Sequence, residues 1–168
     1  MNEDPLPAPL ARLDRLLAGV GRAVSWLTAV MVGLLFVIVV LRYAFDLGWI
    51  ALQESVIWAH VAVLLLAAAW TLGEDAHVRV DVFYRQLQPR GKAIADLLGT
   101  CLLLFPVSVF LLWQSVPYAA RSWRIFEGSP EPSGLPGLFL LKTLMPLAAV
   151  MLILQGVVQA ARCWHRIR

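Results

Sequence analysis

The sequence predicts an all-α integral membrane protein with four transmembrane helices, short amphipathic interfacial helices and both termini in the cytoplasm. Long apolar stretches occur at residues 23–41, 50–72, 93–118 and 139–161. Each has about the 20 residues that a helix needs to cross the hydrocarbon core of a bilayer. Hydrophobic residues make up 60% of the chain and charged residues 15%, against about 25% charged residues in a typical soluble domain. Residues 1–168 are therefore predicted to form a single four-span membrane domain.

The segment 1–22, before the first span, is predicted to hold an interfacial helix. Prolines at positions 5, 7 and 9 predict that the first nine residues are not helical. Beyond them, an apolar stripe recurs at helical spacing, and the charged residues lie mostly on the opposite side. The stripe consists of Leu10, Leu13, Leu16, Leu17 and Val20, and the charged residues are Arg12, Asp14, Arg15 and Arg22. This pattern is typical of a short helix on the membrane surface.

The two longer connections between spans have different patterns. The connection 73–92 carries an apolar stripe at helical spacing (Val80, Phe83, Tyr84 and Leu87) that ends before Pro89, which predicts a second interfacial helix. The connection 121–138 is rich in glycine and proline and is predicted to be a turn-rich loop. Pro106 and Pro146 lie inside spans three and four and are expected to bend them.

The distribution of basic residues predicts the orientation. Of the 14 lysines and arginines, ten lie before span one, between spans two and three, or in the tail. The other four lie in the remaining segments. Because short cytoplasmic segments are enriched in basic residues, the first set is predicted to be inside. The connection 121–138 is then periplasmic.

Two charged residues lie near the ends of the first two spans. Arg42 closes span one and Glu54 lies about one turn into span two, so the short loop between the spans places them at similar depth. An intramembrane charge is expensive and needs a partner or a purpose. The hypotheses are a pair between Arg42 and Glu54, a contact of either with a partner protein, or proton or cation binding by Glu54.

The sequence predicts no enzyme, cofactor or metal site. It carries no zinc-protease, nucleophile-elbow or phosphate-loop motif. Cys101 and Cys163 lack metal-ligand spacing. His60 is a single mid-span histidine and cannot supply both axial ligands of a haem, so it is predicted to lie in the core or at an interface. The basic residues flank the spans rather than one soluble face, so nucleic-acid binding is not expected.

The densest polar motif follows span two. It reads His77-Val78-Arg79-Val80-Asp81, and Gly73 stands four residues before it. Together with Arg42-Tyr43, Glu54, the segment 87–90 and the four-span layout, it resembles the small membrane subunit of the tripartite ATP-independent periplasmic (TRAP) transporters, the DctQ-type family. Many members of that family carry a Glu-Glu pair followed by a basic residue at the start of span two. This chain has Gln53, Glu54 and Ile57 there.

The resemblance implies a non-catalytic small permease subunit in the bacterial inner membrane. Its partners would be membrane lipids, a periplasmic substrate-binding protein and a large multi-span subunit that moves as an elevator. The large subunit would carry the sodium and organic-acid sites, and the small one would scaffold it. Arg42, Glu54, His77, Arg79 and Asp81 are then interface or structural polar residues. The alternative is a self-sufficient proton-coupled exporter that acts as a homodimer, with Glu54 as its carboxylate.

Overall fold

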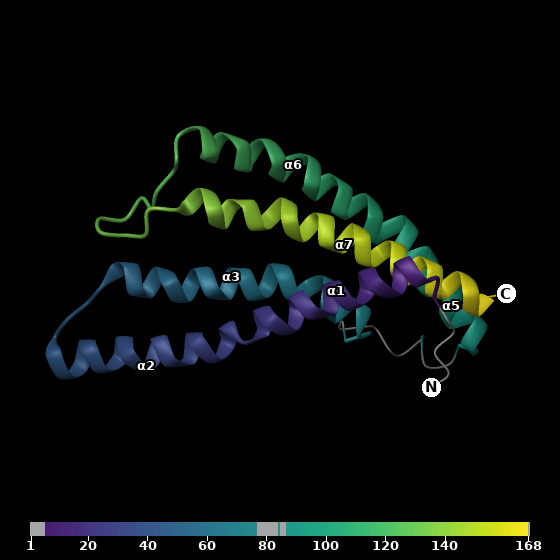
Figure 1. Ribbon diagram of the computed structural model, residues 1–168, viewed down its shortest axis with the longest axis horizontal. Coiled ribbons are helices and arrows are strands. Elements are labelled where there is room, and N and C mark those ends of the chain that lie inside the picture. Colours follow the sequence, from purple (N-terminus) through teal and green to yellow (C-terminus); the bar gives the residue numbers. More distant parts are fainter. Residues whose placement is uncertain (1–5, 77–83, 85–86, 168) are drawn as a thin grey trace.

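The computed structural model describes residues 6–76, 84 and 87–167, and these residues form a helical protein (Figure 1). The elements are α1 (Ala8–Ser25), α2 (Leu27–Phe45), α3 (Ile50–Gly73), α5 (Pro89–Gly99), the π-helical turn η1 (Thr100–Leu104), α6 (Phe105–Arg124) and α7 (Leu138–Ile167). They make four rods that are long and apolar enough to span a membrane: Ala8–Phe45, Ile50–Gly73, Pro89–Arg124 and Leu138–Ile167. The predicted all-α, four-span fold is confirmed.

The rods form two antiparallel hairpins, α2 with α3 and α6 with α7 (Figure 1). We call the end that holds the connections 46–49 and 125–137 the loop end, and the opposite end, where α1 begins and α7 ends, the terminal end. Helix α1 packs on α3 and α7 at the terminal end, and α3 also packs on α7 directly. The buried residues of α7 lie between positions 148 and 163, toward the same end. The two hairpins are therefore joined mainly at the terminal end.

Helix α1 differs from its prediction in two respects. It begins at Ala8, so the expectation of nine non-helical residues was wrong. Pro9 lies in the first turn, where a proline is tolerated because its missing N–H has no intrahelical acceptor there. The helix also continues almost directly into α2, since the backbone at Trp26 keeps right-handed helical angles (φ −63°, ψ −22°).

The apolar stripe of α1 forms part of the protein core. Leu17 packs with Ala69 of α3 and Met151 of α7, and these three residues are at most 6% exposed. Around them lie partly buried leucines: Leu13, Leu66, Leu152 and Leu154. The stripe that predicted a membrane-surface helix therefore packs against other helices, at least through Leu13 and Leu17.

The contact between α6 and α7 depends on small side chains. The buried residues of α6 are Ser108, Ser115, Ala119 and Ser122. Small residues let membrane helices approach closely, which increases van der Waals contact where lipid offers no hydrophobic drive for association. This stripe explains why the second hairpin packs along its length.

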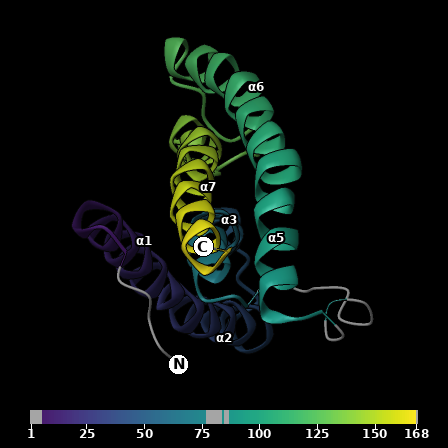
Figure 2. The ribbon, with the colours of Figure 1, turned by 90° about the vertical axis from the view of Figure 1, so that its right-hand side faces the viewer.

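Proline is accommodated in span three by a local change of helix type. Pro106 comes directly after η1, and the N–H of Phe105 bonds the carbonyl of Thr100, five residues earlier. A proline ring clashes with the carbonyl four residues before it in an α-helix, and the wider π-turn relieves that crowding. In Figure 2 the rod from α5 to α6 follows a bowed path beside α7. Pro117 and Pro146 lie inside helices that continue past them.

Gly21 provides a test of the packing between α1 and α3. A Cβ added at Gly21 would overlap the Cβ of Trp70, so Gly21→Ala must push the two helices apart. We expect a loss of about 1–3 kcal/mol, the usual cost of overpacking, measured as a lower Tm of the purified protein in detergent. Gly19→Ala is the matched control, because nothing lies within 4 Å of its added Cβ. An equal effect of the two substitutions would contradict the packing described here.

Candidate functional site

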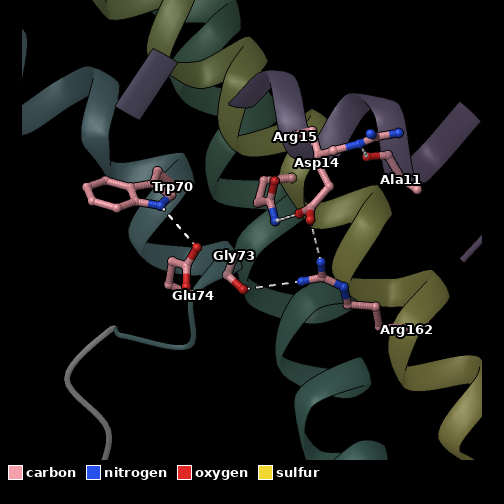
Figure 3. Close-up of polar contacts among 8 residues, drawn as sticks. Ala11, Asp14, Arg15, Trp70, Gly73, Glu74 and Arg162 are labelled. Atoms are coloured by element: carbon pink, nitrogen blue, oxygen red, sulfur yellow. Dashed lines mark hydrogen bonds and ion pairs between the residues drawn. The ribbon is translucent and has the colours of Figure 1, made fainter. Parts of the chain in front are cut away.

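Three helices meet in a polar network at the terminal end, centred on Asp14 of α1 (Figure 3). Arg162 of α7 donates through Nη2 to Asp14 Oδ2 at 2.6 Å, and Gln155 Nε2 donates to Asp14 Oδ1 at 3.1 Å. Arg162 also donates through Nη1 to the backbone carbonyl of Gly73, the last residue of α3, at 3.2 Å. One guanidinium thereby links α1, α3 and α7.

Each member of this network suits its position. The Gly73 carbonyl lies at the C-terminus of α3, the negative end of the helix dipole, so a guanidinium stabilises it. Glycine at position 73 leaves room for the amide of Gln155, because an added Cβ would lie 2.5 Å from Gln155 Nε2 and would displace it. Gln155 itself is 1% exposed, and a buried amide must be hydrogen-bonded to avoid a desolvation cost. The carboxylate of Asp14 meets that need.

The sequence pattern predicts Asp14 on the polar side of a surface helix, and the structure corrects this. The side chains of Asp14 and Arg162 are each 25% exposed. Asp14 is the single acidic residue of α1. Gln155 is a polar residue inside an otherwise apolar run of α7. These two features of the sequence could have indicated a buried polar contact, but neither of them identifies the partner residue.

A second polar contact lies at the loop end, where Glu54 holds the connection 125–137. The Ser129 hydroxyl donates to Glu54 Oε1, and the Leu135 N–H donates to Oε2 at 2.6 Å. The Ser129 N–H in turn bonds the Leu135 carbonyl at 3.0 Å. An added Cβ at Gly134 would lie 2.5 Å from Ser129 Cβ and 2.8 Å from Glu54 Oε2, so a larger residue there would shift the loop against the carboxylate.

The structure does not bring Arg42 and Glu54 together. Both carboxylate oxygens of Glu54 are bonded by the loop, whereas Arg42 is exposed and forms no ion pair with any described residue. The predicted pair fails because the loop, 75 or more positions along the chain, supplies the partners of Glu54. A similar expected depth in the membrane was therefore not enough to pair Arg42 with Glu54.

The ends of α6 and α7 are also joined at the loop end. Lys142 Nζ lies 2.5 Å from Glu127 Oε2 and 4.4 Å from the centre of the Tyr118 ring. The hydrogen bond from Lys142 lowers the pKa of the Glu127 carboxyl below its ordinary value, so this pair stays charged at neutral pH. Trp123 donates to Thr143 Oγ1 at 2.8 Å beside it.

The motif residues His77, Arg79 and Asp81 lie outside the described residues, so their roles remain predictions. The predicted interfacial helix after span two falls largely in the same segment. Tyr84 is described, and its hydroxyl donates to Asp96 Oδ2 of α5 at 2.7 Å. The described part of the chain contains no group of three or more His, Cys, Asp or Glu side chains placed to hold a metal ion.

The polar side chains described above connect helices to helices or to a loop. A family model described as "Tripartite ATP-independent periplasmic transporters, DctQ component" matches residues 31–166. The chain belongs to this family. It is the small membrane subunit of a TRAP transporter, a multi-pass protein of the inner membrane. No curated protein and no solved structure matched the chain.

The family match begins inside α2, so it leaves out α1. Asp14 is therefore a residue outside the matched region, while its partners Gln155 and Arg162 lie inside it. The terminal network attaches α1 to the part of the chain that the family model matches.

A double-mutant cycle on Asp14 and Arg162 tests the terminal network. We expect Asp14→Ala and Arg162→Ala each to lower the free energy of unfolding, with a coupling of about 1 kcal/mol, between the values for exposed and fully buried pairs. The measurement is thermal or denaturant unfolding in detergent. Arg15→Ala is the control, because Arg15 is exposed and, among the described residues, its side chain bonds the Ala11 carbonyl one turn earlier and no other group. Additive single effects would show that the two residues do not interact.

The anchoring of the loop by Glu54 is tested by hydrogen exchange. A glutamine at this position has one acceptor oxygen in place of two and carries no charge, so it binds Ser129 and Leu135 less strongly than the carboxylate does. We expect Glu54→Gln to speed exchange of the Leu135 amide about ten-fold or more, as loss of a charge-assisted hydrogen bond implies. Arg42→Gln should leave that amide unchanged. An equal effect of the two substitutions on the exchange of the Leu135 amide would instead support a direct pair between Arg42 and Glu54.

Proposed function

We propose that this chain is the non-catalytic small permease subunit of a sodium-coupled, binding-protein-dependent importer of organic acids. Its role is to scaffold a large elevator-type subunit that carries the substrate and sodium sites. The observation that supports the proposal most is the family match over residues 31–166. The organic-acid substrate and the sodium coupling follow from the resemblance of the sequence to this family.

The contacts within the chain support a stationary role. Transport sites of secondary transporters are commonly built at discontinuous helices near the middle of the bilayer. Among the described residues, the four long rods continue without an unwound segment. The polar contacts of Asp14 and Glu54 lie instead toward the two ends of the molecule, where they tie helices and a loop together.

We further propose that both termini are cytoplasmic and that the connection 125–137 faces the periplasm. Helix α1 begins and helix α7 ends at the same end of the molecule (Figure 1). Among the described residues, five exposed arginines lie toward that end (Arg12, Arg15, Arg22, Arg90 and Arg166) and three toward the loop end (Arg42, Arg121 and Arg124). The positive-inside rule assigns such an end to the cytoplasm. The loop end would then be available to the periplasmic binding protein.

Reconstitution tests the proposed function. The chain and the large subunit are co-expressed, purified together and placed in liposomes with the binding protein and labelled carboxylates, including 2-oxo acids. We expect uptake that needs a sodium gradient and all three components, and none with this chain alone. Uptake by this chain alone would refute the non-catalytic role, and failure of the two membrane subunits to co-purify would refute the scaffold.

The same liposomes separate the proposal from the exporter alternative. A homodimeric exporter with Glu54 as its proton carboxylate would give proton-driven efflux with this chain alone, and Glu54→Gln would abolish that efflux. A scaffold subunit gives no efflux, either as the wild-type chain or as Glu54→Gln. Since Glu54 is bonded by Ser129 and Leu135, we expect Glu54→Gln to change the loop and not a transport step.

A further inference from the structure

Helix α3 has one uncovered face, and that face is a narrow stripe. Between Ile50 and Gly73 the exposed residues are Gln53, Ile57, His60 and Leu64. The spacing of four, three and four residues places them along one side of the helix. We call these four residues the α3 stripe. The rest of α3 is covered by packing against α1, α2 and α7.

His60 lies at the middle of the α3 stripe and near the middle of the span. It follows Ile50 by ten residues, so it lies about 15 Å along the helix, half of a hydrocarbon core about 30 Å thick. His60 is exposed, and within the described parts of the chain its imidazole has no hydrogen-bond partner. Both of its ring nitrogens are thus available on the outer surface of the subunit.

Lipid is a poor neighbour for this face. A neutral imidazole carries one donor and one acceptor, and hydrocarbon tails satisfy neither, so the exposed ring costs free energy at this depth. The outward face of α2 differs, since Val32, Phe36 and Val39 there are apolar and 51–68% exposed. Lipid covers such a surface without cost. The α3 stripe instead requires a neighbour that offers hydrogen bonds at mid-membrane depth.

The flanks of His60 describe the shape of that neighbour. Ile57 and Leu64 are 58% and 65% exposed, one turn to either side, and Gln53 adds an amide nearer the loop end. A single line of side chains at this spacing matches the seam between two packed helices. The complementary surface is a membrane helix with a polar side chain opposite His60 and small or apolar residues above and below it.

We propose that the α3 stripe is the seam on which a membrane helix of the large transporter subunit packs, with a hydrogen-bonding side chain opposite His60. The proposal rests on the proposed function, because it takes the large subunit as the neighbour. In a tripartite transporter, the second membrane component supplies this helix. The α3 stripe offers it a hydrogen bond through His60, which a purely apolar surface cannot form.

Photo-crosslinking in the assembled transporter tests the position of the seam. A benzophenone amino acid is placed at Leu64 and, separately, at Phe36, which is exposed in the middle of α2. Irradiation of native membranes should link the Leu64 variant to the large subunit, more efficiently than the Phe36 variant. A co-purifying complex without this adduct, or an adduct of two small subunits, would overturn the seam but leave the proposed function intact. A wild-type chain that does not co-purify with the large subunit would refute both.

Substitution of His60 tests the hydrogen bond. We expect His60→Leu to weaken association with the large subunit about three-fold to twenty-fold, the range for hydrogen bonds between membrane helices. His60→Gln, which keeps a donor and an acceptor, should restore most of the association, and Phe36→Leu is the apolar control. The Tm of the isolated small subunit should be the same for wild type and His60→Leu, because His60 has no partner within the described chain. Unchanged association of His60→Leu, or a lowered Tm with it, would overturn the proposal.

Discussion

The ion pair between Asp14 and Arg162 is the contact on which the arrangement of the helices depends. It joins positions 148 residues apart in the sequence, and the second arm of the guanidinium reaches the end of α3 at Gly73. A charged pair in a partly dry site gains stability only if its remaining donors and acceptors are also bonded. Here Gln155 and the Gly73 carbonyl meet that requirement. Burying these groups requires precise geometry, because one register of α1, α3 and α7 forms all of their hydrogen bonds.

The loop end follows a different principle. There a carboxylate organises a loop, because Glu54 accepts from Ser129 and from the Leu135 backbone. The Glu127–Lys142 pair adds a second tie between the helices that the loop connects. Between the two ends, α6 and α7 rely on small side chains and close packing. The chain is thus held together by polar contacts toward its two ends and by small residues along the second hairpin. Between the two ends, side chains face outward.

That outward surface is the part of a small subunit that is available for contact with a larger one. Most of it is apolar, as lipid requires, but α3 exposes His60 at mid-depth. Polar groups at such a depth are costly in lipid and are normally turned toward other protein. The polar contacts at the two ends are made within the chain, and the α3 stripe is the face on which we propose that the partner packs.

The sequence by itself determined the spans, because the length of an apolar stretch reports directly on the thickness of the bilayer. The family also followed from sequence, through the motif at residues 77–81 and the layout of the spans. The partners of Asp14 and Glu54 were decided only by the tertiary structure. Arg42 and Glu54 lie at similar expected depth, yet Glu54 is bonded by a loop 75 to 81 positions away, and Asp14 turns from the expected polar surface toward α7. Span length is a local property of the chain, whereas these contacts depend on which faces of distant helices meet, and that is set by the packing of residues such as Gly21, Gly73 and Ser108.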